Sequence, residues 1–339
     1  MVKNLIKNMI YYSGFNQVIR LLYGGHTSII MLHRVCPQSR EIDDPTSQME
    51  ISPEFLENFI LKKKKQGWNF ISLDYLYENF DKCAKYRKNI VFTLDDGFKD
   101  NYSFAYPVFK KHNVPFTIYV TNCYPNNIAK LWWYDFIDII ETNKEISFDF
   151  KGEIISIDCD NIDSAFNNLR TFYLALDQES KDIVYAELKS KYGFNDYTNL
   201  LMTWNDVKTL SKDPLCTIGA HTLTHTNLKV LRNDELYREI YFSKKELEEK
   251  INKKIEHFSF PYGGKNEASI REIECASKIG FKTCTTTRPG NIHIEHKEFL
   301  NMLPRLSISE YNSNIALNEL QLDGLNSILK HKFKKVITV

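Results

Sequence analysis

Apolar and amphipathic segments alternate along most of the chain. The expected strands are the apolar runs at 28–32, 89–94, 115–120, 215–219, 257–260 and 281–286. The expected helices are the segments at 53–66, 101–111, 234–252 and 265–279, and one that begins after Thr203. Continuous apolar runs are typical of strands that are buried on both faces of a parallel sheet. Six or seven such β-α units with short connections predict an α/β fold, a distorted parallel (β/α)7-type barrel.

The regular alternation fails in three places, and these divide the chain. Residues 1–26 form one candidate unit, an N-terminal amphipathic helical hairpin, and the barrel extends over 27–310. Within the barrel, residues from about 131 to 202 combine a hairpin-like segment with polar helical stretches, which indicates a helical insertion rather than an independent domain. Residues 311–339 are expected to form a C-terminal helix and a basic tail.

The N-terminal hairpin is amphipathic. Apolar residues recur at helical spacing before and after Gly14, and Lys3, Lys7 and Arg20 lie between them. Such a hairpin can dock on the body of the protein or lie on a membrane surface, and both interpretations stay open. The sequence contains no run of about 18 uninterrupted apolar residues and no small-residue cleavage site, so we expect neither a transmembrane helix nor a secretory signal.

The overall composition fits a globular protein. The 339 residues are 43% hydrophobic and 26% charged, and 44 Lys and Arg against 43 Asp and Glu leave a formal net charge of +1. This balance argues against nucleic-acid binding. The seven cysteines are scattered and never form C-x-x-C, which argues against a disulfide framework and a zinc ribbon and favours a reducing compartment.

Residues that carry chemistry gather directly after expected strands. In Thr93-Leu94-Asp95-Asp96-Gly97, two adjacent carboxylates follow a buried strand, at the end of a barrel where enzymes keep their active sites. Because neighbouring residues that leave a strand point in different directions, one carboxylate can bind a metal while the other faces the metal's water. The alternative interpretation is a capped turn in which an aspartate starts a helix.

Two histidines, His221 and His225, follow another expected strand. A spacing of four brings both imidazoles to one side of a helical turn, which suits two ligands of one zinc ion. A lone histidine is more often a core residue with its hydrogen bonds satisfied, but a pair flanked by hydroxyl groups favours a metal. A third segment, Phe258 to Gly264, contains a Pro-Tyr-Gly turn that is also common as a plain chain reversal.

Together and in this order, the three segments resemble the motifs of the polysaccharide deacetylases, which are the NodB-homology or carbohydrate esterase family 4 enzymes. The T-F-D-D-G motif of the family is present here from Thr93 to Gly97, with Leu94 in place of phenylalanine. The H-[ST]-x-x-H motif is present without change from His221 to His225.

The third motif departs from the usual R-x-P-x-G. When it is aligned on Pro261 and Gly263, Ser259 stands where the arginine is expected. The segment is more similar to the F-x-[YF]-P-Y-G of the branch that works in surface-polysaccharide biosynthesis. Segments such as Met31-Leu32-His33-Arg34-Val35 also resemble that branch, and the resemblance covers residues 28 to 310, with the insertion matching poorly.

The resemblance implies a metal-dependent amidohydrolase. Asp96, His221 and His225 would hold one divalent metal ion, with zinc as the default. The metal would activate a water molecule, and Asp95 would take its proton as the general base. The backbone N–H of Tyr262 would help to hold the tetrahedral oxyanion.

The resemblance implies two further roles. A cation should orient Asp95, and because the motif arginine is missing, Arg305 is the candidate, with Arg288 in reserve. The leaving amine needs a proton from a general acid. The family takes it from a histidine in an L-x-H motif, whose letters are matched by Leu329-Lys330-His331 in the basic tail. His33, after the first strand, is the alternative donor or a substrate contact.

The predicted function is removal of the acetyl group from an N-acetylated amino sugar of a surface polysaccharide or its precursor. The alternatives are a non-catalytic carbohydrate-binding barrel, a deformylase of a lipid-linked formamido sugar, and hydrolysis of a small cyclic imide. A complete set of base and ligands favours an enzyme, because binding alone needs no activated water. We expect a carbohydrate partner, no nucleic acid, and a cytoplasmic location with an optional peripheral contact on the inner face of the membrane. The sequence predicts no oligomeric state.

Overall fold

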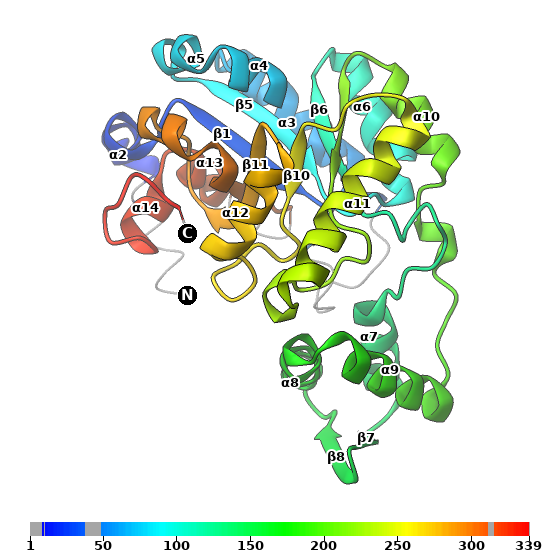
Figure 1. Cartoon of the computed structure of the whole chain (residues 1–339). Coiled ribbons are helices and arrows are strands. Elements are labelled where there is room, and N and C mark those ends of the chain that lie inside the picture. Colours follow the sequence, from blue (N-terminus) through cyan, green and yellow to red (C-terminus); the bar gives the residue numbers. More distant parts are fainter. Residues whose placement is uncertain (1–8, 10, 38–48, 311–314, 339) are drawn as a thin grey trace.

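A closed barrel of parallel strands forms the centre of the molecule. The computed structural model describes residues 9, 11–37, 49–310 and 315–338, and in this part of the chain the barrel has seven strands (Figure 1). They are β1 (Thr27–Leu32), β5 (Asn89–Leu94), β6 (Phe116–Val120), β9 (Cys216–Ala220), β10 (His257–Ser259), β11 (Thr283–Pro289) and β12 (Leu303–Ser307). Each strand pairs with the next along the chain, and β12 pairs with β1 to close the ring. The predicted (β/α)7-type barrel is confirmed.

The strands are apolar because both of their faces are buried. On β5, Phe92 points outward and packs against Phe59 and Phe109 of the surrounding helices. Its neighbour Val91 belongs to a separate cluster with Tyr119 of β6 and Leu303 of β12, inside the barrel. Successive side chains of such a strand point to the inside and the outside of the barrel, and both sides are buried. The strand therefore lacks the alternating polar positions of a half-exposed strand.

Helices cover the outside of the barrel and its N-terminal end. They are α3 (Pro53–Lys65), α4 (Leu73–Glu78), α5 (Phe80–Tyr86), α6 (Tyr106–His112), α10 (Trp204–Lys212), α11 (Asn233–Ile251) and α12 (Ile270–Ile279). Local signals set their ends. Ser52 caps α3 ahead of Pro53, and Thr203 forms a capping box with Asp206 at the start of α10.

Several short elements complete the barrel region. They are β2 (Arg34–Val35), β3 (Glu50–Ile51), β4 (Asn69–Phe70), η2 (Asn101–Ala105), η4 (Leu228–Val230) and η5 (Ile294–Met302). The sequence analysis did not predict β12 as a strand. It contains Pro304, which lacks a backbone N–H, and its pairing with β11 is irregular between Thr285 and Pro289.

Residues 131–202, the insertion lobe, extend from the barrel (Figure 1, green). The lobe contains α7 (Trp132–Thr142), the hairpin β7 (Glu145–Phe150) and β8 (Glu153–Asp158), α8 (Ile162–Ala175), α9 (Gln178–Tyr192) and η3 (Thr198–Leu200). The sequence analysis missed the apolar helix α7. The hydrophobic cluster of the lobe includes Phe98 and Tyr124 from barrel loops, and the Met202 N–H donates to the carbonyl of Gly97 at 3.1 Å. The lobe is therefore anchored beside the Asp95-Asp96 segment.

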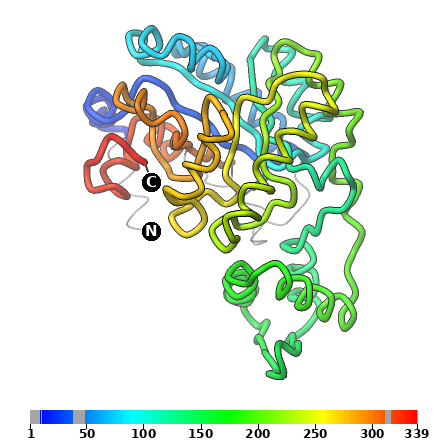
Figure 2. Tube along the Cα trace, viewed as in Figure 1, coloured from blue at the N-terminus to red at the C-terminus, as the bar shows by residue number. Residues whose placement is uncertain are grey.

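The two ends of the described chain lie together (Figures 1 and 2). Helix α2 (Phe15–Tyr23) packs against α13 (Ile315–Leu322) and α14 (Leu325–Leu329) through Ile19, which contacts Leu320 and Leu325. The first helix of the predicted hairpin lies mostly outside the described residues. The division of the chain at residues 26 and 310 stays a prediction.

Candidate metal and catalytic site

The three sequence segments meet at the C-terminal end of the barrel. Asp95 and Asp96 follow β5, His221 follows β9, and Tyr262 lies in the turn after β10. Together with His33 after β1, these residues line a cavity of about 290 Å³. Parallel strands bring these distant positions to one edge, as the sequence pattern predicts.

Asp96, His221 and His225 form a cluster with the geometry of a metal site. Asp96 Oδ1 lies 3.1 Å from His225 Nε2 and 3.3 Å from His221 Nε2. One ligand atom from each of the three residues falls within 4.8 Å of the others. Asp96 Oδ1 is buried and has no hydrogen-bond partner among the described residues. The Asp96 oxygen and the two imidazole nitrogens offer three ligand atoms, and the oxygen is buried without a hydrogen bond. Such a set fits a divalent cation such as zinc.

The surroundings of the two histidines orient one imidazole ring and favour the neutral form of the other. His221 Nδ1 lies 2.7 Å from the carbonyl oxygen of Ser259, and this contact orients the ring. Burial lowers the pKa of His225, although the nearby charge of Asp96 opposes the shift. A neutral imidazole is the form that binds a metal, so burial favours the ligand state.

The segment from His221 to His225, the histidine loop, is not helical, so the expectation of a helical turn is wrong. Thr222 and His225 have left-handed φ values of 69° and 58°, and these turn the chain so that both rings converge on Asp96. Asp96 itself has a φ of 76°. Left-handed conformations are unfavourable for residues with side chains and persist where the surroundings fix them.

Glu239 of α11 fixes the histidine loop. Its carboxylate accepts hydrogen bonds from the N–H of Leu223 at 3.0 Å, the N–H of Thr224 at 3.1 Å and the Thr224 hydroxyl at 3.0 Å. The sequence analysis did not find this residue. An acidic residue in a helix rich in charged residues gives no signal of such a contact.

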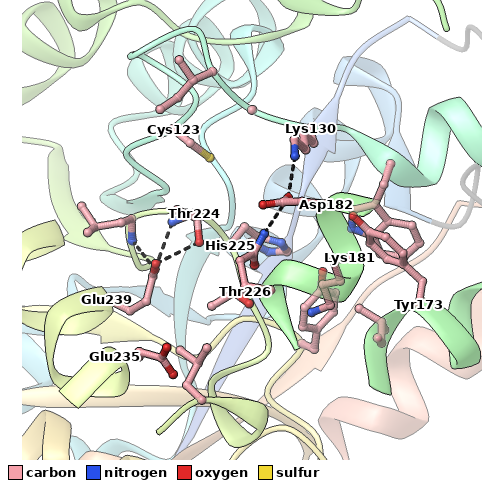
Figure 3. Close-up of a pocket in the computed structure, with 18 of the residues that line it drawn as sticks. Cys123, Lys130, Tyr173, Lys181, Asp182, Thr224, His225, Thr226, Glu235 and Glu239 are labelled. Atoms are coloured by element: carbon pink, nitrogen blue, oxygen red, sulfur yellow. Dashed lines mark hydrogen bonds and ion pairs between the residues drawn. The ribbon is translucent and has the colours of Figure 1, made fainter. Parts of the chain in front are cut away.

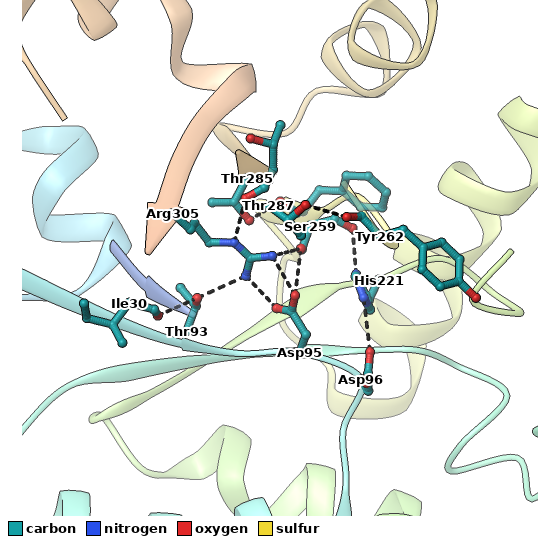
Figure 4. Close-up of polar contacts among 12 residues, drawn as sticks. Ile30, Thr93, Asp95, Asp96, His221, Ser259, Tyr262, Thr285, Thr287 and Arg305 are labelled. Atoms are coloured by element: carbon teal, nitrogen blue, oxygen red, sulfur yellow. Dashed lines mark hydrogen bonds and ion pairs between the residues drawn. The ribbon is translucent and has the colours of Figure 1, made fainter. Parts of the chain in front are cut away.

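Asp95 forms a buried ion pair with Arg305 of β12 (Figure 4). Arg305 Nη1 and Nη2 each donate to a different carboxylate oxygen of Asp95, both at 2.6 Å. Arg305 is 1% exposed. Burial by itself would raise the pKa of Asp95, but the charge and hydrogen bonds of Arg305 outweigh it and hold that pKa below its usual range. Asp95 is therefore ionised, as a general base must be.

Ser259, at the position of the missing motif arginine, belongs to the same network. Its hydroxyl oxygen accepts a hydrogen bond from Arg305 Nη2 at 2.9 Å and lies 3.4 Å from Asp95 Oδ2 (Figure 4). A small side chain here leaves room for the guanidinium that arrives from β12. The reserve candidate Arg288 is not near Asp95, because its guanidinium donates to the carbonyls of Ala268 and Thr338.

The two histidines considered as proton donors are in different places. His33 lines the catalytic cavity and is partly exposed to it. His331 Nε2 lies 2.8 Å from the carbonyl oxygen of Pro289 and is not among the residues that line this cavity. The expectation that the late L-x-H segment supplies the acid is therefore wrong for this arrangement of the tail.

Tyr262 forms one wall of the cavity. Its ring packs edge-on against the ring of His225, with centroids 4.9 Å apart. The residue has a left-handed φ of 60°, and the structure gives its N–H no hydrogen-bond partner among the described residues. A free, fixed N–H beside the metal ligands has the character of an oxyanion donor.

A second buried ion-pair network supports the residues around His33. Arg34 Nε donates to Asp100 Oδ2 at 2.7 Å, and Arg34 Nη1 donates to Glu50 Oε1 at 2.6 Å. Arg34 Nη1 also donates to the Tyr134 hydroxyl of the insertion lobe at 3.0 Å. The sequence analysis noted Arg34 only within a family-like segment. Its partners are far apart in sequence, so no local pattern could reveal them.

Comparisons with known proteins agree with this site. The family model for polysaccharide deacetylase matches residues 171–283, about a third of the chain, and this segment contains His221 and His225. The match agrees with the resemblance of the three motifs to the polysaccharide deacetylases, which are hydrolases that act on amide bonds. A search of curated protein sequences finds no match.

Solved structures share the fold of this chain. The deacetylase PplD of Streptococcus pyogenes has a TM-score of 0.59 at 17% identity, and the match covers 87% of this chain and 97% of that chain. IcaB of Ammonifex degensii has a TM-score of 0.56 at 16% identity, with coverage of 88% and 98%. The de-N-acetylase of Aggregatibacter actinomycetemcomitans has a TM-score of 0.55 at 15% identity, with coverage of 87% and 99%.

The buried pair of Asp95 and Arg305 leads to a prediction on stability. Replacing Arg305 by Met leaves a buried carboxylate without a counter-charge, and we expect the free energy of unfolding to fall by about 3 to 5 kcal/mol. Adding Asp95→Asn to Arg305→Met removes that charge, and the double variant should recover much of the loss. Urea denaturation measures both effects. As a control, Lys297→Met removes a surface ion pair and should change stability by less than about 1 kcal/mol. A double variant no more stable than Arg305→Met would contradict this account.

The cluster of Asp96 and the two histidines leads to a prediction on metal content. The protein should bind one divalent ion per chain, and His221→Ala or His225→Ala should remove it, because each deletes one of three protein ligands. His331→Ala, outside the cavity, should keep the ion. Elemental analysis after dialysis against trace zinc measures the stoichiometry. Full metal content in either ligand variant would exclude that histidine from the site.

Proposed function

We propose that this protein is a metal-dependent N-deacetylase of the polysaccharide deacetylase type, which removes acetyl from an N-acetylated amino sugar of a surface polysaccharide or its precursor. The observation that carries the proposal is the convergence of two units on one cavity. These are the ionised Asp95 held by Arg305, and the cluster of Asp96, His221 and His225. A base next to a metal-ligand cluster is the arrangement that amide hydrolysis requires.

The side chains of the cluster would hold a divalent metal, and we propose zinc. When bound, such an ion polarises the amide carbonyl and lowers the pKa of water toward about 7. Asp95 then receives the proton of the attacking water. Arg305 fixes the orientation of the Asp95 carboxylate through both oxygens, so the base is positioned before substrate arrives.

Two other groups complete the proposed reaction. The N–H of Tyr262 donates to the oxygen of the former amide carbonyl as negative charge develops on it. His33 donates a proton to the departing amine, because it lines the same cavity at the end of β1, the strand next to β5. The amine leaves only when protonated, so this step releases the sugar and acetate.

Other reactions use the same groups. Deformylation of a formamido sugar and hydrolysis of a small cyclic imide need the same base and ligands, and a non-catalytic carbohydrate-binding barrel needs neither. The buried, unsatisfied oxygen of Asp96 favours an enzyme over a binding module, because a site that only binds sugar gains nothing from it.

The metal-loaded protein should release acetate from N-acetylated amino sugars faster than formate from their N-formyl analogues. Asp95→Asn should lower kcat at least 100-fold and keep the metal, because the amide preserves the shape but cannot accept the proton. Acetate and formate release measures the rates, and elemental analysis measures the metal. Faster formate release would favour the deformylase, and unchanged turnover in Asp95→Asn would move the base to another residue.

We also propose that the protein works in the cytoplasm and contacts the inner face of the membrane. None of the described helices is long and apolar enough to cross a bilayer. On α2, Phe15, Val18, Leu21 and Leu22 are between 47% and 68% exposed. Apolar side chains that project from a helix in this way can enter the headgroup region of a bilayer.

Basic residues of the C-terminal tail lie next to this exposed face. Lys332, Lys334 and Lys335 are exposed, and Lys335 Nζ lies 5.7 Å from the ring centroid of Tyr23 at the end of α2. Exposed lysines beside apolar side chains favour an anionic lipid surface. Arg20 does not contribute as the sequence analysis expected, because it pairs with Asp323 at 3.4 Å and stacks on Trp68.

The protein should therefore sediment with vesicles that contain phosphatidylglycerol, and less with vesicles of phosphatidylcholine alone. Leu21→Asp should weaken sedimentation several-fold, and high salt should weaken it further because it screens the lysines. Ile183, an apolar residue on the insertion lobe, is 50% exposed against 68% for Leu21, and Ile183→Asp is the control that should have no effect. Equal sedimentation with both kinds of vesicle, or none, would contradict the membrane contact.

A further inference from the structure

The insertion lobe builds a second cavity against the catalytic one. This second cavity has a volume of about 500 Å³ and lies between α8 and α9 of the lobe and α11 of the barrel (Figure 3). Four residues line both cavities: Trp132, Trp133, His225 and Tyr262. A ligand whose amide reaches the metal ligands can therefore extend past this shared wall into the second cavity.

Lys181 of α9 is a buried cation in the second cavity. Its side chain is almost fully buried, with 4% of the residue exposed, and its Nζ lies 5.8 Å from the ring centroid of Tyr173. Among the described residues, no carboxylate lies within 4.0 Å of its Nζ. The adjacent Asp182 instead pairs with Lys130 at 2.6 Å (Figure 3). Burial lowers the pKa of Lys181 to about 8, so the amine is still largely charged at neutral pH.

The acidic residues around Lys181 have other partners. Asp177, whose charge acts most on Lys181, caps α9 by accepting a hydrogen bond from the N–H of Ser180 at 2.7 Å. Glu235 pairs with Arg232 at 3.0 Å, and Glu239 accepts its hydrogen bonds from the histidine loop. A second cation in this cavity, Arg238, lies over the ring of Phe242. Lys181 therefore has no carboxylate at contact distance among the described residues, although Asp177 and Asp182 act on its charge from farther away. A buried ammonium without a contact partner is costly unless a ligand compensates it.

The catalytic cavity contains an equivalent feature. Arg170 of α8 lines it from the insertion lobe and has no ion pair or hydrogen bond among the described residues. Of the three carboxylates that line this cavity, Asp95 pairs with Arg305, Asp96 faces the two histidines, and Glu267 lies more than 4.0 Å from the Arg170 guanidinium. Within the described chain, the lobe thus presents one cation without a contact carboxylate to each cavity beside Trp132 and Trp133.

We propose that the substrate is an N-acylated amino sugar that carries a phosphate or diphosphate group, which binds to Lys181 and Arg170 of the insertion lobe. This inference rests on the proposed function and names its substrate class. A phosphate ester carries up to two negative charges and several acceptor oxygens, which suits two cations on adjoining cavities. The aromatic wall offers apolar faces to the sugar ring. A neutral polymer would leave both cations without a partner.

Binding to the metal-free protein tests the anion site without any reaction. Inorganic diphosphate should bind to the wild-type protein, and Lys181→Met should weaken the binding at least 10-fold in isothermal titration. Lys181→Arg keeps the charge and should retain most of the affinity. Lys189→Ala, an exposed lysine on the same helix, is the matched control and should bind as the wild type does. Equal affinity of Lys181→Met and wild type would overturn the proposal, provided that both melt at the same temperature. If Lys181→Met does not fold, Arg170→Ala replaces it in the same titration.

Kinetics separate this inference from the proposed function. The metal-loaded protein should have a kcat/KM for N-acetylglucosamine 1-phosphate at least 10-fold above that for N-acetylglucosamine. Arg170→Ala and Lys181→Met should abolish this preference by raising KM for the phosphorylated substrate only. If acetate is released at the same rate with and without a phosphate on the sugar, the phosphate inference is overturned and the proposed deacetylase function stands. If diphosphate binds through Lys181 but no substrate releases acetate, the anion site stands and the proposed deacetylase function is overturned.

Discussion

The ion pair between Asp95 and Arg305 is the interaction on which the active site depends. It joins the second and the last strand of the barrel across the interior, where neither charge has access to bulk water. A carboxylate buried in this way would take up a proton, and a protonated carboxyl cannot serve as a base. The guanidinium therefore decides the chemistry of Asp95, and Ser259 provides the space that the guanidinium occupies.

Several residues at the mouth of the barrel have unfavourable backbone conformations, and residues outside the three sequence motifs stabilise them. Asp96, His225 and Tyr262 adopt left-handed conformations, which residues with side chains avoid. Glu239 holds the histidine loop from α11, and the network around Arg34 fixes the segment after β1. The motifs thus supply the reactive atoms, and the helices and the insertion lobe hold them in place.

The sequence predicts the features that depend on neighbouring residues, and it misses those that depend on contacts between residues far apart in the chain. The strands β1, β5 and β9 were predictable because continuous apolar runs report burial on both faces, and the position of Asp95 and His221 after them follows from parallel topology. β12 was missed because Pro304 interrupts the pattern, and α7 was missed because its apolar run was grouped with the polar stretches of the insertion. Arg305 was found only through resemblance, whereas Glu239 acts through contacts that no local spacing encodes.

The order of the strands has a consequence for how the enzyme is made. Each strand of the barrel pairs with the next along the chain, so a nascent chain can add them one by one as it leaves the ribosome. The partner of Asp95, however, is 210 residues away and belongs to the last strand. Until that strand is synthesised, the ring is open and the aspartate lacks its counter-charge. Closure of the ring therefore also supplies the counter-charge of Asp95, so under the proposed function a chain that ends before β12 has no positioned base.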